Sequence, residues 1–190
     1  MNQDNFNSNQ LDKPSENEIE VELASPWNRI AAYIINTVLT SLVITPGIIF
    51  LIIEIYRSKS ISFNLIAPIL LILIPLTIYG IWQIIIMSKT GQSLGKRMMN
   101  IKVIGMDGQN PGFVGTVLLR EIVFNIIASI ASLILSFIFI YILNFPETLT
   151  TNVFDYLVPI ILLVMLFRKN NHHRTLQDYL ARTIVIKVNN

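Results

Sequence analysis

A few polar side chains interrupt long apolar runs of the sequence, and these are the residues whose types and spacing could do chemistry. Arg29 lies at the start of the first apolar run, and Asn36 lies inside it. On a helix this spacing separates the two side chains by about 10 Å along one face, which Thr40 extends by a turn. We expect this stripe to face protein rather than lipid, because its polar groups need partners.

Two roles are open for each of the first two residues. Asn36 either hydrogen-bonds a neighbouring helix, the role that we prefer, or belongs to a ligand or ion site. An amide cannot take up a proton or supply the negative charge that a sodium site prefers. Arg29 either extends its guanidinium to lipid phosphates beside an interfacial Trp27, the role that we prefer, or forms a fixed pair with a carboxylate.

A second polar stripe is predicted in the third apolar run. Its members recur at helical spacing and are Glu121, Asn125, Ser129, Ser132 and Ser136. An ionisable group is costly in lipid, so Glu121 should face the other helices or the membrane interface. Gln83, near the end of the second run, is a further polar side chain that could bind a ligand or a neighbouring helix.

The elements that must position these residues are membrane-spanning helices. The chain is 53% hydrophobic and only 14% charged, and its mean hydropathy is positive. Apolar runs of the required length of about 20 residues lie near 30–53, 64–87, 121–143 and 148–167. The fold class is therefore an all-α polytopic membrane protein with about four transmembrane helices. Asn152 and Asp155 make the fourth span the weakest, so three spans remain an alternative.

The distribution of lysine and arginine predicts the orientation. Basic residues gather between the second and third spans and again after the fourth, whereas the other two connections carry few. The positive-inside bias then places both basic segments and both termini in the cytoplasm. Residues 1–24 are polar and acidic, lack the features of a signal peptide and are expected to form a disordered cytoplasmic tail.

The basic segments also carry signals for regular structure. A short strand is indicated around Ile101, Val103 and Ile104, before the turn signal at Asp107 and Gly108. A second is indicated over 181–188, where Ile184, Ile186 and Val188 alternate on one side. Two such strands on one side of the membrane would form a small cytoplasmic β element that caps the helices.

Two further features lie between the second and third spans. Residues 112–120 are apolar, and 113–143 is too long for a simple span, so an interfacial helix that bends into the third span is expected. Gly91 and Gly95 have the four-residue spacing of small residues that is typical of helix dimers, but they lie outside an apolar helix. A turn and a close approach of the backbone are therefore favoured over dimer packing.

Four segments in order carry a resemblance to a known family. They read "WNRIAAYIIN", "GQSLGKRMMNIKVIGMDG", "LLREIVFNI" and "RTLQDYLARTIVIK", and together they resemble the RDD family of bacterial inner-membrane proteins, which is named for one arginine and two aspartates. The resemblance places the family arginine at Arg29 and the second aspartate at Asp178. The first aspartate falls on Asn36, and the histidine common before the last aspartate is replaced by Gln177.

The resemblance implies a location and a fold more than an activity. Transport of unknown ligands has been proposed for the family, and some members are regarded as sodium/proton antiporters. We expect a multi-pass protein of the bacterial plasma membrane that acts as an assembly or partner-binding module. Its inner-face polar cluster would contain Arg29, Asn36 and Asp178. A cation/proton antiporter or small-ligand transporter is the alternative, and Glu121 keeps it open.

Other classes of function have little support in the sequence. It has no nucleophile elbow, phosphate-binding glycine loop or metal-binding helix motif, so no enzyme activity, cofactor or metal is expected. Cysteine is absent, which excludes thiol chemistry. The net charge of +2 averages two basic segments and an acidic tail, so no nucleic-acid partner is predicted. The expected partners are the lipid bilayer, a second copy or another membrane protein, and, for transport, a monovalent cation.

Overall fold

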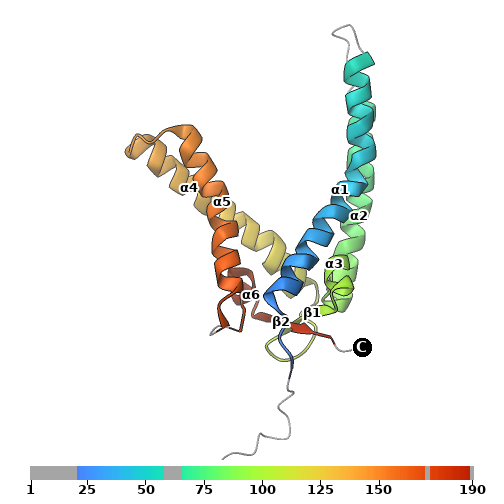
Figure 1. Ribbon diagram of the computed structural model, residues 1–190, viewed down its shortest axis with the longest axis vertical. Helices are drawn as coiled ribbons and strands as arrows, with labels where there is room; N and C mark the ends of the chain where they lie inside the picture. The colour runs from blue at the N-terminus through green and yellow to red at the C-terminus, as the bar shows by residue number, and fades with distance from the viewer. Residues whose placement is uncertain (1–20, 58–65, 170–171, 189–190) are drawn as a thin grey trace, which may run out of the picture.

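A computed structural model describes residues 21–57, 66–169 and 172–188. Two long helical hairpins diverge from a common base in a V shape (Figure 1). One arm contains α1 (Pro26–Arg57) and α2 (Ile66–Thr90), and the other contains α4 (Phe124–Phe137) and α5 (Glu147–Leu166). The base contains α3 (Leu94–Met98), β1 (Ile101–Gly105), α6 (Leu176–Leu180) and β2 (Thr183–Lys187).

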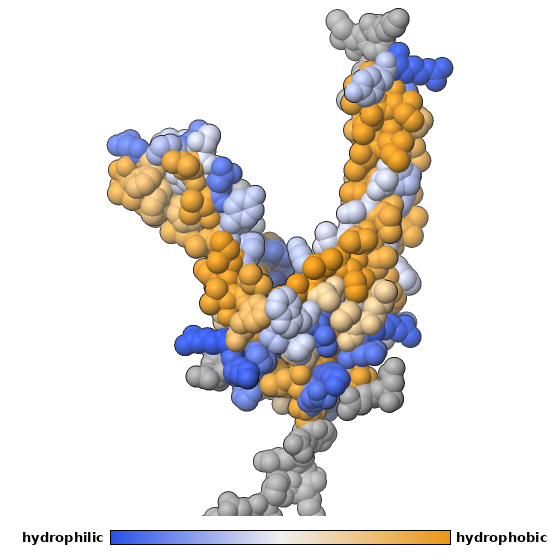
Figure 2. Space-filling view, viewed as in Figure 1, coloured by the Kyte–Doolittle hydropathy of each residue, from blue (hydrophilic) through white to orange (hydrophobic). Residues whose placement is uncertain are grey.

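The prediction of four spans is confirmed. Within the described residues, four helical segments are long and apolar enough to cross a membrane. They are Pro26–Arg57, Ile66–Thr90, Val114–Ile142 and Glu147–Leu166. Apolar side chains cover both arms, whereas hydrophilic side chains gather at the base and near the tips (Figure 2). This distribution is the one that a bilayer around the arms requires.

The first helix begins earlier than its apolar run predicts. The backbone N–H of Asn28 donates to Ser25 Oγ over 3.2 Å, and Pro26 occupies the first helical position, where its missing N–H costs nothing. Arg29 is therefore in the first turn of α1, at the base. The helix then continues through Pro46 to Arg57.

The third span differs from the expected interfacial helix followed by a bend. A π-helix, η2 (Val114–Val123), runs directly into α4, which is followed by a second π-helical segment, η3 (Ile138–Ile142). The residues that were expected to form a separate interfacial helix are thus helical, but they form the first part of one continuous helix. Arg120 and Glu121 both lie in the π-helical turns, where the face that each residue occupies differs from that in an α-helix.

The two predicted strands form an antiparallel pair in the base. Val103 lies opposite Val185, and Ile101 lies opposite Lys187. Ile101, Val103 and Val185 are buried with Ala32 of α1 in a small core. The face of β2 turned to this core carries Thr183 and Val185, whereas Ile184 and Ile186, on the other face, are only half-buried.

The residues just before α1 extend this sheet, which corrects the predicted boundary of the tail. Leu23 forms an antiparallel bridge with Ile186. Ala24 N donates to Val185 O over 3.0 Å, and Lys187 N donates to Glu22 O over 2.8 Å. Residues 22–24 therefore belong to the folded base, because their backbone groups complete the edge of β2. The rest of the predicted disordered tail, 1–20, lies outside the described residues.

A glycine permits α3 to approach α1. A Cβ on Gly95 would overlap the backbone oxygen of Ala32, so the close approach expected at this position is present. Gly80 of α2 provides a matched control, because a Cβ there meets no atom within 4 Å.

We predict opposite outcomes for alanine at these two glycines. Gly95→Ala must separate α3 from α1 and should lower the free energy of unfolding by about 1–3 kcal/mol, the usual cost of overpacking. Gly80→Ala should be neutral or stabilising by up to about 1 kcal/mol, because alanine is the better helix former. Unfolding of both variants in detergent measures the difference, and equal stabilities would contradict the close α1–α3 contact.

Candidate functional site

Asp178 is the centre of the polar cluster in the base. Thr175 is the N-cap of α6, and Asp178 is the third residue of that helix, so the two form a capping box. The backbone N–H of Thr175 and its hydroxyl both donate to Asp178 Oδ2, over 3.0 and 3.1 Å. The Asp178 side chain is fully buried. A local helix-start motif therefore fixes this carboxylate in the interior.

Two arginines from different helices neutralise the carboxylate. Arg29 Nη1 of α1 lies 3.1 Å from Asp178 Oδ2, and Arg120 Nη1 of η2 lies 2.6 Å from Asp178 Oδ1. Both guanidinium side chains are themselves buried, with exposed fractions of 9% and 6%. Arg29 therefore has the fixed pair with a carboxylate and not the preferred contact with lipid phosphates. The carboxylate thus joins α1, η2 and α6 at one point.

The same arginines also hold the sheet and the chain that leads to α6. Arg29 donates to the backbone oxygens of His173 and Val185, over 2.8 and 3.3 Å. Arg120 Nη1 donates to Thr183 Oγ1 over 3.0 Å. Thr183 is fully buried, so its hydroxyl requires this partner. Every element of the base except α3 and β1 is therefore bonded directly to this ion cluster.

The charge state of Asp178 follows from its neighbours. Burial alone would raise its pKa, but Arg120, Arg29 and the hydrogen bonds from Thr175 together hold the pKa below the ordinary aspartate value. The carboxylate is ionised at neutral pH. Its contribution to stability is present above the unfolded-state pKa and is lost only as the pH falls through the lower folded-state value.

Asn36 belongs to a neighbouring network that caps α3. Its Oδ1 accepts from the backbone N–H of Gly95 over 2.8 Å, and its Nδ2 donates to Ser93 Oγ over 2.8 Å. From α2, Gln83 Oε1 accepts from the backbone N–H of Leu94 over 3.3 Å. The first N–H groups of α3, which have no partner within that helix, are thus satisfied by side chains of both long helices. Two roles were open for Asn36. In the structure its amide hydrogen-bonds a neighbouring helix, which is the role that we preferred.

The remaining polar residues singled out in the sequence, Thr40, Glu121 and Asn125, do not bond to the Asp178 ion cluster. Thr40 Oγ1 donates to the backbone oxygen of Asn36 in its own helix over 2.9 Å. Asn125 is exposed, and its amide donates to the backbone oxygen of Glu121. Glu121 is half-buried beside the cluster, close enough to act electrostatically on Lys96. The predicted second stripe is not a continuous buried face, because its first residue lies in a π-helix and Asn125 and Ser129 are exposed.

The match to known families agrees with this geometry. The family model of the RDD family matches residues 23–182, which contain the whole ion cluster. The chain belongs to the RDD family. With four helices suited to crossing a membrane, this RDD protein is an integral membrane protein. Comparison with curated proteins and with solved structures gives no significant match.

The described part of this RDD protein offers no metal-binding group. Its 21–57, 66–169 and 172–188 segments contain no set of three or more His, Cys, Asp or Glu side chains suited to a metal ion. His173 has a structural contact instead, because its Nδ1 lies 2.8 Å from the backbone oxygen of Leu166.

Sequence reasoning missed three members of these networks. Arg120 was expected only as one of the basic residues between the second and third spans, although it lies in the quoted segment "LLREIVFNI". An arginine within an apolar segment is itself a signal for a buried acidic partner. Thr183 and Ser93 carry no comparable signal, because isolated hydroxyl residues are common in strands and before helices.

We predict that Arg29 and Asp178 are energetically coupled. Arg29→Ala and Asp178→Ala should each lower the free energy of unfolding by about 3–5 kcal/mol, because each leaves a buried charge unmatched. Asp178→Ala should cost more, since two arginines then lose their partner. The double variant should cost clearly less than the sum of the single changes. Unfolding in detergent at neutral pH measures these values.

An exposed ion pair of the same base serves as the control. Lys187 Nζ lies 3.0 Å from Glu22 Oε1, and both side chains are largely exposed. Glu22→Ala should cost no more than about 1 kcal/mol. Strictly additive losses for Arg29 and Asp178 would mean that the two residues act independently, with Arg29 serving as a lipid anchor.

Asn36→Asp should be tolerated, because a carboxylate can replace each contact of the amide. One oxygen would accept from the Gly95 N–H, and the other would accept from the Ser93 hydroxyl. Thr37 is the adjacent, exposed residue of α1, so Thr37→Asp places the same charge towards lipid and should cost about 2–4 kcal/mol or prevent insertion. Folded yield in detergent compares the two, and a severe loss confined to Asn36→Asp would contradict the described network.

Proposed function

We propose that this RDD protein is an assembly or partner-binding module of the bacterial plasma membrane. The observation that supports this function best is the ion pairing of both Asp178 oxygens with buried arginines. One of its oxygens faces Arg120, and the other accepts from Arg29 and Thr175. A cation that enters this site would have to displace a bound guanidinium. The cluster is therefore suited to holding the base together rather than to carrying an ion.

The orientation is part of the proposal. The base contains the segments between α2 and η2 and after α5, which carry most of the lysine and arginine residues. By the positive-inside bias this end faces the cytoplasm, together with both termini. The base would then present the sheet, α3 and α6 to cytoplasmic or membrane partners, including a second copy of the chain.

Cation or small-ligand transport is the alternative, and Glu121 favours it. This half-buried carboxylate lies in a membrane-crossing helix, and its charge partly offsets the lowering of the Lys96 pKa that burial and Arg120 cause. Other observations oppose transport. The described helices continue through Pro46, Pro75 and Pro159, so these prolines create no broken helices of the kind that form transporter sites.

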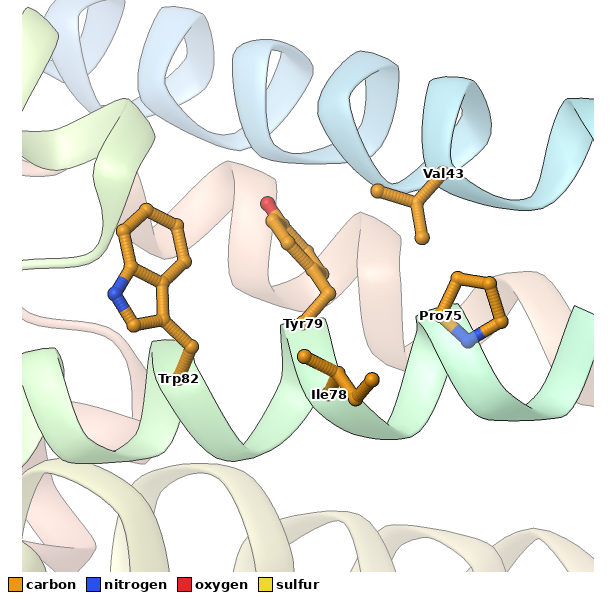
Figure 3. A pocket seen from close by; sticks show the side chains of 5 residues that line it. All are labelled: Val43, Pro75, Ile78, Tyr79 and Trp82. Carbon is orange, nitrogen blue, oxygen red and sulfur yellow. The ribbon is translucent and has the colours of Figure 1, made fainter.

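The hollow on the α1–α2 arm also suits no ion. It has a volume of about 410 Å³ and is lined by Val43, Pro75, Ile78, Tyr79 and Trp82. Figure 3 shows these side chains between α1 and α2. No lining residue carries a charge, and the surface is almost wholly apolar. A desolvated cation would find no carboxylate there to compensate its charge.

Two measurements test the proposal. Purified protein in liposomes should give no cation- or proton-dependent flux above that of protein-free liposomes. Flux in the wild type that is lost in Glu121→Gln would contradict the proposal and support transport. In addition, a photocrosslinking residue at exposed Met106 in the base should give a discrete protein adduct in cells, whereas one at exposed Ile78 on an arm should give lipid adducts only. Absence of an adduct from the base would also contradict the proposal.

A further inference from the structure

The sheet in the base carries a groove on the face that is turned away from the helices. The groove has a volume of about 380 Å³. The side chains that line it include Val21, Lys102, Ile104, Met106, Ile184 and Ile186. Figure 1 shows the sheet at the end of the molecule from which both arms rise. The groove is therefore separate from the ion cluster and from the membrane-crossing arms.

The strand register explains why these side chains share one face. Lys102 lies opposite Ile186, and Ile104 lies opposite Ile184. Directly opposed residues of an antiparallel pair lie on the same side of the sheet. The other side packs against Ala32 of α1 in the small core of the base. The groove is thus on the outer face of the sheet.

The groove combines uncovered apolar side chains with one unpaired cation. Ile184 and Ile186 are only half-buried, and Met106 is exposed. Lys102 forms no ion pair with any residue in the described part of the chain. Such a surface is complementary to an extended segment in which an apolar side chain is flanked by carboxylates.

The N-terminal part of this chain leads directly to the groove. Val21, the first described residue, is one of its lining residues. Leu23 forms a bridge with Ile186 of β2, and both carboxylate oxygens of Glu22 bind Lys187 Nζ, over 3.0 and 3.1 Å. Residues 1–20, which lie outside the described residues, therefore precede an interface that is already formed at one end of the groove.

The sequence before Val21 has the pattern that the groove requires. Residues 16–23 read "ENEIEVEL", in which apolar residues alternate with glutamates from position 18 onward. In an extended chain Ile19 shares the side of Val21 and Leu23. Two residues of extended chain advance about 7 Å, and the same advance on β1 leads from the Lys102 end of the groove to its middle. Ile19 can therefore reach the apolar floor.

We propose that the acidic segment 16–20 of this chain occupies the groove. Ile19 packs on the half-buried isoleucines of β2, and the glutamates on either side of it pair with Lys102. Another chain can then reach this part of the sheet only by displacing the segment. The inference does not depend on the proposed function, because Met106 lies at the other end of the groove and stays exposed.

Disulfide formation in the full chain tests the proposal. The protein has no cysteine, so two introduced thiols can react only with each other. Ile19→Cys combined with Ile184→Cys should form an internal disulfide on mild oxidation in detergent. Glu18→Cys combined with Ile184→Cys is the matched control, because position 18 has the same reach but lies on the opposite side of an extended segment. The first pair should react about tenfold faster, since a disulfide requires Cα atoms within about 7 Å of each other.

A second pair of variants tests the role of charge. Lys102→Glu should slow the reaction of the first cysteine pair several-fold, because it replaces the attraction of the glutamates by repulsion. Lys89→Glu makes the same change at an exposed lysine outside the groove and should leave the rate unchanged. Ile186→Cys provides a second position in the groove and should show the same preference for position 19 over position 18.

Three results would overturn the proposal. Equal rates for positions 18 and 19 would show that the segment only collides with the groove. Equal slowing by Lys102→Glu and Lys89→Glu would show general electrostatic attraction. Disulfide-linked dimers in place of the internal disulfide would show that the segment of a second copy fills the groove. None of these results bears on the crosslink from Met106, so the proposed function is tested separately.

Discussion

A carboxylate can be buried only where positive charges and hydrogen bonds replace its lost hydration, and this constraint at Asp178 governs the base of the molecule. Asp178 receives Arg29 from the first long helix and Arg120 from the third. Neither guanidinium can reach it unless both helical hairpins meet at one end. Further N–H groups of the arginines then bind β2 and the segment before α6, so that this later part of the chain closes under the helices.

The two arms diverge because this linkage acts only at the base. The α1–α2 arm is anchored through Arg29 and through the caps that Asn36 and Gln83 provide to α3. The other arm is anchored through Arg120. Beyond the base the arms expose apolar side chains, as Figure 2 shows, and lipid is the solvent suited to that surface. The polar chemistry is confined to one end, which fits a module that assembles with partners better than a path across the bilayer.

Much of this arrangement could be predicted from the sequence, for identifiable reasons. Hydropathy located the spans because the bilayer fixes helix length. The apolar and β-branched residues before a turn signal located β1, and alternation located β2. Resemblance placed Arg29 and Asp178 in one motif, and the structure has them in contact. The apolar surroundings of Arg120 indicate a buried acidic partner, but the identity of that partner could not be read, because Asp178 is distant in sequence and the π-helix alters which face Arg120 occupies. The buried face of β2 was hidden for a related reason. Thr183 lies inward, where its hydroxyl accepts from Arg120, while the more apolar Ile184 lies on the other face.

The protonation state of Asp178 tests the central claim most directly. A carboxyl-labelled aspartate can be followed by infrared difference spectroscopy as the pH is lowered, with Asp178→Asn identifying its band. Because Arg120, Arg29 and Thr175 together outweigh burial, the band of the ionised carboxylate should persist below the pH at which an ordinary aspartate is protonated, and its loss should accompany unfolding. Protonation at or above the ordinary aspartate pKa, with the fold intact, would contradict a carboxylate held between two arginines.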